Sequence, residues 1–337
     1  MFKKAACFTD IHFGLKNNSR QHNNDCENFV KWFIKEAKEF GAETCIFLGD
    51  WHHHRSSINI STLNYSISNL KRLSDAFEQT YFITGNHDLF YRDKREISSV
   101  VFAQEIPNIK VVNEILVKDD VAIVPWLIGN EWKKIQKIKC KYMFGHFELP
   151  NFKMNAMVEM PDHGEIQASH FSHIEKVFTG HFHKRQHKGN ISYIGNPFAH
   201  NYADAWDNDR GCMFLEWDKE PLYKIWADGP KYRTITLSKL LESPEDYLEP
   251  ETHVRIKIDI DVTYEEANFI KENFQNTYNL REISLLPHKE VEDEMEFQGE
   301  IKFQSVDEIV LDQLTNIESD TFDNSVLIEI YNRLWSN

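Results

Sequence analysis

The sequence predicts an α/β fold of short strands alternating with helices, followed by a smaller α+β unit. Two observations support this class. Five apolar, β-rich runs each end abruptly in a cluster of Asp, His, Asn or Gly, at residues 5–9, 45–48, 81–84, 142–144 and 177–179. Helical periodicity lies between the first three runs. In α/β folds the polar strand ends gather at one edge, where ligands bind.

Two helices are expected between the early strands, at 28–40 and 62–77. In both stretches apolar side chains recur three or four residues apart and therefore share one helix face. These side chains are Phe29, Phe33, Ala37 and Phe40 in the first helix, and Leu63, Ile67, Leu70 and Leu73 in the second.

The 337 residues are too many for one compact core, so about two domains are expected. We assign the first to 1–230. A small α+β capping domain at 231–289 should hold a strand at 254–260, a helix at 264–274 and a strand at 283–286. Residues 290–337 should form an acidic linker and two short amphipathic helices, the first opening with a capping box of Ser305 and Glu308. Their apolar stripes are Val306, Ile309, Val310, Leu314 and Ile317, then Val326, Ile330 and Leu334.

Composition points to a cytoplasmic protein with two differently charged parts. The longest apolar stretch, 121–128, is too short to span a bilayer, and no signal segment opens the chain. The five cysteines include no CxxC pair, so we expect reduced thiols. The net charge of −15 lies mostly in 231–337, which holds 10 basic and 24 acidic residues. The preceding 230 residues are nearly neutral, which leaves nucleic-acid binding open for them.

The polar clusters at the strand ends have the composition of a metal centre. They are Asp10-Ile11-His12, Gly49-Asp50, Gly85-Asn86-His87-Asp88, Gly145-His146 and Gly180-His181-Phe182-His183. Mixed carboxylate, imidazole and amide ligands suit Mn²⁺, Fe²⁺ or Zn²⁺. Seven or more ligands are too many for one ion, and Asp50 has two oxygens with which to bridge two. One such pair alone would usually be a surface loop, but five in order, each after a strand, predict a two-metal site.

As a set, these clusters resemble those of the calcineurin-like metallophosphoesterase superfamily over about residues 5–217. Within it the chain looks most like the SbcD family of double-strand-break-repair nucleases. Further stretches carry the resemblance: 48–51, 124–126, 145–149, 193–197 and the turn 209–211 before a strand at 212–217. The resemblance implies a β-sandwich flanked by helices, with a capping domain and C-terminal helices that bind a partner.

The resemblance also implies roles for single residues. One metal would be held by Asp10, His12, Asp50 and His183, and the other by Asp50, Asn86, His146 and His181. The usual ion of the family is Mn²⁺. His87 would be a catalytic histidine that is not a ligand, and Asp88 would hydrogen-bond its imidazole. His53 would contact the nucleotide, although His52 and His54 beside it leave open which histidine faces the site.

We therefore expect a two-metal DNA nuclease, with 3′→5′ exonuclease action on duplex DNA and endonuclease action on single strands. A rim of cations near the motifs favours phosphate contact, namely Lys16, Arg20, Arg55, Arg92, Lys94, Arg95, Lys184, Arg185 and Lys188. A phosphoesterase for cyclic nucleotides or phosphoproteins is the alternative. By resemblance, the partners are an SMC-like ATPase (SbcC-type) bound through the C-terminal helices, and a second copy bound through helices near 62–77 and 96–104. The alternative for those helices is packing within the chain's own fold.

Overall fold

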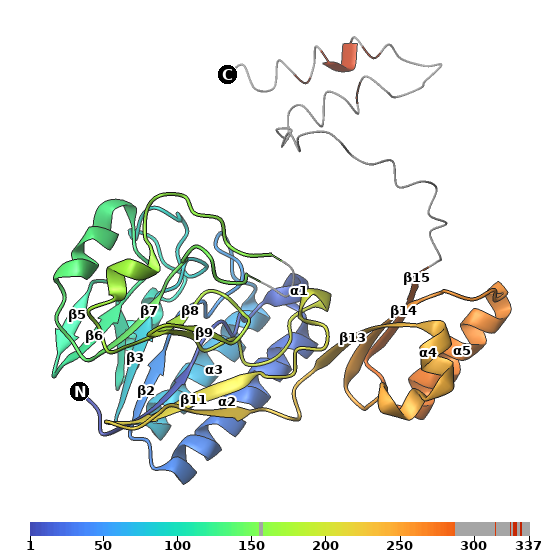
Figure 1. The fold of residues 1–337 in the computed structure, drawn as a ribbon, viewed down its shortest axis with the longest axis horizontal. Helices are drawn as coiled ribbons and strands as arrows, with labels where there is room; N and C mark the ends of the chain where they lie inside the picture. Colours follow the sequence, from blue (N-terminus) through green and yellow to red (C-terminus); the bar gives the residue numbers. More distant parts are fainter. Residues whose placement is uncertain (155–157, 287–313, 315–323, 325, 329–330, 332–337) are drawn as a thin grey trace. The chain divides into compact units, whose positions relative to one another are not determined.

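The computed structural model describes residues 1–154 and 158–286, together with Leu314, Asn324, 326–328 and Tyr331 (Figure 1). The chain divides into two compact units, Met1–His288 and Lys289–Asn337. Apart from those isolated residues, the predicted linker and tail helices lie outside the described part. So do six residues of the predicted apolar stripes, namely Val306, Ile309, Val310, Ile317, Ile330 and Leu334.

Two six-stranded mixed sheets form most of the first unit. One has the order β12-β11-β1-β2-β3-β4, and the other β5-β6-β7-β8-β10-β9. The first comprises β1 (Lys4–Phe8), β2 (Thr44–Phe47), β3 (Gln79–Ile83), β4 (Ile109–Val112), β11 (Gly211–Glu216) and β12 (Leu222–Ile225). The second comprises β5 (Leu116–Lys118), β6 (Val121–Val124), β7 (Tyr142–His146), β8 (Lys176–Gly180), β9 (Gln186–Lys188) and β10 (Ile191–Tyr193). Strands β1 to β4 pair in parallel, as do β6, β7, β8 and β10.

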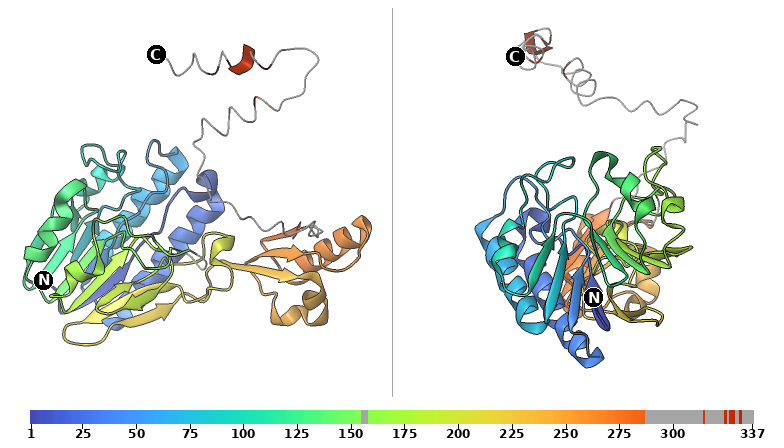
Figure 2. Two further views of the ribbon diagram at one scale, coloured as in Figure 1. Left: turned by 45° about the horizontal axis from the view of Figure 1, so that its top comes forward. Right: turned by 90° about the vertical axis from the view of Figure 1, so that its left-hand side faces the viewer.

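The sheets pack face to face, because one buried apolar cluster takes side chains from both, such as Ile46 of β2 and Phe144 of β7. Helices α2 (Arg20–Phe40) and α3 (Ile60–Ala76) cover the outer face of the first sheet through a second cluster. The 3₁₀ segments η2 (Gly129–Lys137) and η3 (Ala168–Phe171) cover the second sheet through a third. Figure 2 shows these layers from two further sides. The predicted α/β sandwich flanked by helices is confirmed.

A third, parallel sheet of β13 (Lys231–Thr236), β14 (Thr252–Lys257) and β15 (Glu282–Leu286) follows in the chain. With α4 (Leu237–Glu242), α5 (Tyr264–Thr277) and the short η5 (Pro244–Asp246) it surrounds a core of its own. Arg281 donates to both carboxylate oxygens of Asp25 in α2, at 2.6 and 2.7 Å. The assignment of 231–289 as a separate capping domain stays a prediction.

Two expected elements differ in length or type. Helix α2 begins at Arg20 and not at 28, with Ser19 accepting from the backbone N–H of His22. The expected helix at 96–104 is instead a 3₁₀ segment, η1 (Val101–Glu105). Pro107 accounts only for the end of this segment, because a proline disfavours helical backbone in the residue before it, here Ile106. Helices α1 (Leu15–Asn18) and η4 (Tyr202–Asp204) complete the described elements.

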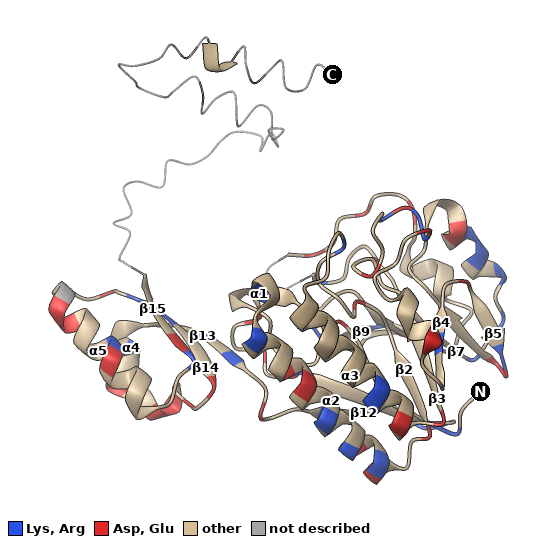
Figure 3. Ribbon diagram, turned by 180° about the vertical axis from the view of Figure 1, so that it is seen from behind, with Lys and Arg blue, Asp and Glu red and all other residues tan. Residues whose placement is uncertain are grey.

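The surface of α2 carries interspersed charges of both signs, whereas the first turn of α5 is acidic, with Glu265 and Glu266 (Figure 3). Within the described residues, no helix is both long and apolar enough to cross a membrane.

Candidate metal centre

Five strands deliver the predicted ligands to one edge of the sandwich. Asp10 and His12 follow β1, Asp50 follows β2 and Asn86 follows β3 in the first sheet. The remaining ligands come from the second sheet: His146 ends β7, and His181 and His183 follow β8. Because β1, β2 and β3 are parallel, as are β7 and β8, the carboxyl ends in each sheet lie together.

The ligand atoms form two groups. Those of Asp10, His12 and His183 lie within 4.8 Å of one another, and so do those of Asp50, His146 and His181. The Oδ2 atom of Asp50 lies 3.7 Å from Nε2 of His12 and 3.4 Å from Nε2 of His146, so this carboxylate stands between the groups. Asn86 joins the second group, since its Oδ1 is 3.1 Å from Nε2 of His146 and 2.9 Å from Nδ1 of His181.

Two of the histidines, His146 and His181, are oriented by contacts outside the ligand groups. Nδ1 of His146 lies 2.7 Å from the carbonyl oxygen of Leu48, which leaves Nε2 toward Asp50. Nε2 of His181 lies 2.9 Å from Glu148, which leaves Nδ1 toward Asn86. Such outer contacts fix the tautomer and the ring direction of a ligating imidazole.

His12 provides the clearest test of whether a metal fits. It is buried, and within the described part of the chain neither of its ring nitrogens has a hydrogen-bond partner. A buried polar group without a partner is costly. Neutral imidazole and carboxylate are suitable donors for a divalent transition metal, so these residues fit the pair of ions that the sequence predicts.

Burial and mutual charge shift the ionisation of this cluster. Burial raises the pKa of Asp10 to about 7. Burial acts in the same direction on Asp50, but His146 and the other nearby imidazoles outweigh it and hold the pKa of this carboxyl well below its usual range. For His146, burial lowers the pKa, but Asp50 and Asp10 outweigh this effect and raise it to about 9. Burial lowers the pKa of His12.

The backbone around the ligands is strained and tightly packed. Asp10, His12, Asp50 and His181 all have positive φ, at 51°, 52°, 62° and 93°. Such conformations cost free energy in residues other than glycine and concentrate at functional sites. A Cβ on Gly85 would lie 2.2 Å from Oδ1 of Asp50, which explains why glycine precedes Asn86.

His53 is the member of the 52–54 run that faces the site. Its ring stacks on that of His87 at 5.4 Å, and ligand atoms of His12, His53 and His87 lie within 4.8 Å of one another. His52 instead is buried between Ser66 and Ser99, which it contacts at 2.9 and 3.0 Å. The structure therefore brings His53, and not His52, to the site, and the contact of His53 with a nucleotide stays a prediction.

The role expected for Asp88 is wrong in one respect, because its carboxylate does not bond the imidazole of His87. Asp88 is fully buried and accepts hydrogen bonds from the backbone N–H groups of Gly85, Asp50, Trp51 and His52, at 2.9 to 3.1 Å. These four donors use up its acceptor capacity. Nδ1 of His87 lies 2.8 Å from the carbonyl oxygen of His53, which orients this ring instead.

Sequence reasoning missed two groups that pack behind the ligands. His200 is buried beside His12 and His183, with ring centroids 5.5 and 5.1 Å away. Arg210 is buried and donates to the carbonyl oxygen of His183 at 2.9 Å. It also bonds Asn196, Asp204 and Asp207. Arg210 lies in the turn 209–211 that carries part of the resemblance, but neither residue shares a short motif with the ligands, so spacing alone gave them no role.

The expected rim of cations is weaker than the sequence predicts. Arg92, Arg95 and Arg185 form ion pairs with Glu148, Glu131 and Asp209, respectively. Lys16 donates to the hydroxyl of Tyr232. The carboxylates that offset these charges lie far away in sequence, which hides the pairing from a linear reading.

A comparison with protein families agrees with this geometry. The family model described as calcineurin-like phosphoesterase matches residues 3–237. Exonuclease subunit 1 of Enterobacteria phage T4 is 25% identical over 340 residues, which cover 97% of this chain and 96% of that protein. Among solved structures, a dimetal phosphatase from Danio rerio aligns at 8% identity with a TM-score of 0.41, over 66% of this chain and 95% of its own. Nuclease MPE of Pseudomonas putida aligns at 19% identity with a TM-score of 0.30, and the alignment covers 56% of this chain and 66% of that one.

Proposed function

We propose that this chain, which belongs to the calcineurin-like phosphoesterase family, is a nuclease that hydrolyses DNA phosphodiester bonds with two divalent metal ions. The observation that carries the proposal is the pair of ligand groups joined by Asp50. Similarity to a phage exonuclease subunit along almost the whole chain supports DNA as the substrate over a cyclic nucleotide or a phosphoprotein.

In this proposal Asp10, His12, Asp50 and His183 hold one ion, and Asp50, Asn86, His146 and His181 hold the other. Mn²⁺ fits the mixed donor set. When bound, two such ions would supply Lewis acidity and favour ionisation of the water whose hydroxide attacks phosphorus.

The protein's own groups position the substrate and move the proton. The Nδ1–H of His87 donates to the His53 carbonyl, which leaves Nε2 for the leaving oxygen. In the imidazolium form, Nε2 carries the proton that passes to this oxygen, and Nδ1–H keeps its bond to the carbonyl. His53, stacked on His87, is placed to contact the same nucleotide. We propose 3′→5′ exonuclease action on duplex DNA and endonuclease action on single strands.

The biological setting that we propose is DNA recombination and end repair with an SMC-like ATPase subunit of the SbcC type. The support is the similarity to a protein named as one subunit of an exonuclease, which indicates a complex with a further subunit. The tail segment 290–337 would provide the contact.

The proposal is tested by comparing Asp50→Ala with His87→Ala in Mn²⁺. Both variants should lose DNA cleavage, by at least about a hundredfold, because each removes a group that acts in the transition state. Metal analysis should separate them. Asp50→Ala should lose bound metal, whereas His87→Ala should retain nearly the full amount, since His87 is not a ligand.

A matched control is His187→Ala, which removes an exposed histidine of β9 and should leave both activity and metal content intact. Equal metal loss in the Asp50 and His87 variants would refute the role given to His87. Absence of DNA cleavage by the metal-loaded wild-type chain, with hydrolysis of bis(4-nitrophenyl) phosphate retained, would refute the DNA substrate.

A further inference from the structure

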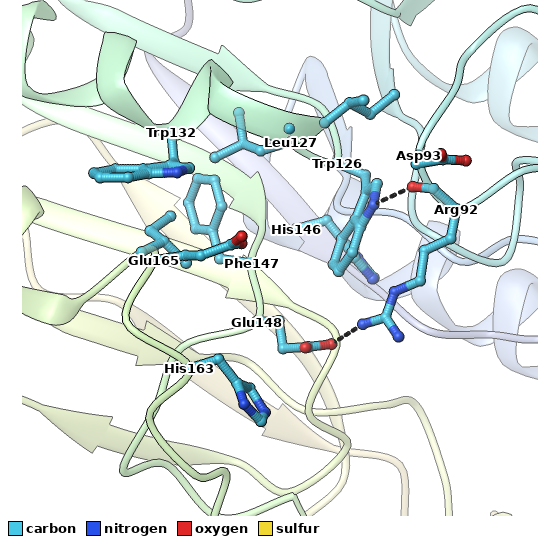
Figure 4. A pocket seen from close by; sticks show the side chains of 13 residues that line it. Arg92, Asp93, Trp126, Leu127, Trp132, His146, Phe147, Glu148, His163 and Glu165 are labelled. Atoms are coloured by element: carbon cyan, nitrogen blue, oxygen red, sulfur yellow. Dashed lines mark hydrogen bonds and ion pairs between the residues drawn. The ribbon is translucent and has the colours of Figure 1, made fainter.

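A pocket of about 520 Å³ adjoins the second ligand group (Figure 4). His146, one of the proposed metal ligands, lines it, and so does Glu148, which contacts the ligand His181. The volume is in the range of small-molecule sites. The proposed catalytic histidines, His53 and His87, do not line this pocket, so the mechanism above leaves it without a role.

The walls of the pocket are mainly aromatic. Trp126, Trp132 and Phe147 line it together with the aliphatic side chains of Leu127, Ile128 and Ile166. Figure 4 shows Trp132 and Phe147 on one side and Trp126 with Arg92 on the other. Walls of this kind suit a flat, apolar-faced ligand that stacks on the rings.

The aromatic walls are held rigidly. The indole N–H of Trp126 donates to the carbonyl oxygen of Arg92 at 3.0 Å, and the Arg92 guanidinium lies 5.3 Å from the centre of the Trp126 ring. Trp132 stacks on His170 at 5.0 Å with an interplanar angle of 18°. A preformed pocket binds a ligand without the cost of ordering its own side chains.

The carboxylates of the pocket outnumber its cations, which disfavours a phosphate. Asp93, Glu148 and Glu165 line the pocket, and the cationic or basic side chains that face them are Arg92, which is already paired with Glu148, and His163. Carboxylates repel a phosphate, but they accept hydrogen bonds from the exocyclic amino groups of adenine, cytosine and guanine. The pocket therefore matches the base of a nucleotide, whose phosphate would belong at the metal centre.

We propose that this pocket binds the base of an unpaired nucleotide that adjoins the scissile phosphate. The inference rests on the proposed nuclease function and adds a specific substrate conformation. A base enters such a pocket only when it has left the stack of its own strand. Single strands and frayed 3′ ends would be bound directly, whereas a paired terminal nucleotide would first have to separate from its complement.

The experiment uses the full chain with Mn²⁺ and a set of single-stranded oligonucleotides. One substrate is intact, and two carry an abasic analogue on either side of the scissile phosphate. The wild-type chain should cleave one abasic substrate with a kcat/KM at least about tenfold lower than the intact one, because stacking on an aromatic side chain is lost. Trp132→Ala should bring the intact and abasic values close together, and Trp132→Phe should restore most of the difference.

Trp206→Ala is the matched control, since Trp206 is an exposed tryptophan that does not line the pocket. It should discriminate between the substrates as the wild type does. Equal cleavage of intact and abasic substrates by the wild type would overturn the pocket proposal and leave the nuclease proposal standing. If none of the three oligonucleotides is cleaved while bis(4-nitrophenyl) phosphate is hydrolysed, the nuclease proposal itself fails, and the pocket proposal fails with it.

Discussion

At the residue scale, Asp88 holds the metal-site loops in place. Its carboxylate accepts from four backbone N–H groups in two loops that carry Asp50 and Asn86. In Asp88→Asn an amide N–H₂ would face some of those donors. We expect the free energy of unfolding of the metal-free protein to fall by about 3 kcal/mol, because buried backbone N–H groups would be left without an acceptor.

Urea denaturation in the presence of a chelator measures this change. Asp93→Asn, an exposed neighbour, is the control and should stay within about 0.5 kcal/mol of the wild type. Unchanged stability in Asp88→Asn, combined with a shifted pH profile of kcat, would instead point back to an action through His87.

Metal binding should be coupled to proton release. Burial raises the pKa of Asp10 to about 7, and the carboxylates of Asp50 and Asp10 raise that of His146 to about 9 against the effect of burial. Both groups must lose their protons to act as ligands. The affinity for the metal ions should therefore rise with pH. Between pH 7 and 9 only the proton on His146 competes with the metal, and the rise should be about tenfold per pH unit. Below pH 7 the proton on Asp10 competes as well, and the rise should be steeper.

Titration calorimetry in buffers of different ionisation enthalpy counts the protons released. At least one proton per protein should appear at pH 8, and more at pH 6. Binding without proton release at either pH would show that these two groups are already ionised before the metal arrives.

The sequence identifies residues that stand at strand ends, because position in a strand follows from local patterns. It predicts the seven ligand candidates that the structure brings together, from Asp10 to His183. It does not predict that Asp88 turns back onto the backbone, or that His200 and Arg210 pack behind the ligands. The contacts of Asp88 depend on how two loops of one sheet fold together, and those of His200 and Arg210 on how the two sheets pack. No spacing in the chain encodes either.

At the scale of elements, strand positions follow closely from the apolar runs, whereas helix limits do not. The first eight residues of α2 contain buried polar side chains, among them His22, Asn23 and Asp25. Their burial depends on partners elsewhere, such as Arg281 on Asp25, so hydrophobic periodicity places the start of the helix too late.

Helix α3 and the segment before β4 expose apolar side chains, which favours the proposed homodimer. Ile60 is 79% exposed, Ile97 50% and Val101 59%. The alternative is that the apolar face of α3 packs on its own sheet. Leu70 and Leu73 do so, because both are buried. We expect a dimer in light scattering at micromolar concentration, and a monomer when Ile60→Asp and Val101→Asp are combined.

Leu222→Asp in the edge strand β12, where the side chain is 55% exposed, is the control and should leave the mass unchanged. A monomer mass for the wild type would exclude this mode of assembly. The outcome has no bearing on the metal chemistry.

At the scale of the whole molecule, net charge distinguishes the part that holds the metal centre from the acidic C-terminal part. Residues 231–337 carry most of the net charge of −15, whereas the part that holds the metal centre is nearly neutral. An acidic segment repels DNA, so the tail is suited to a protein partner. Its predicted helices are about 13 residues long, too short to be stable alone in water, and their apolar stripes must be buried against something.

We therefore expect the first tail stripe to anchor the SMC-like ATPase. The double change Ile309→Asp and Leu314→Asp places charges on this stripe and should weaken binding of the ATPase subunit by at least about tenfold, as for a buried anchor of an interface. Cleavage by the isolated chain and its stability should stay nearly unchanged. The matched control, Thr315→Asp with Asn316→Asp, adds the same charge beside the stripe and should bind normally. Unfolding of the free double variant, without a specific loss of binding, would show that the stripe packs against the chain's own domains.

Deletion of residues 291–337 gives an independent test of the tail. If cleavage by the complex still responds to ATP as before, the tail does not couple the nuclease to the ATPase.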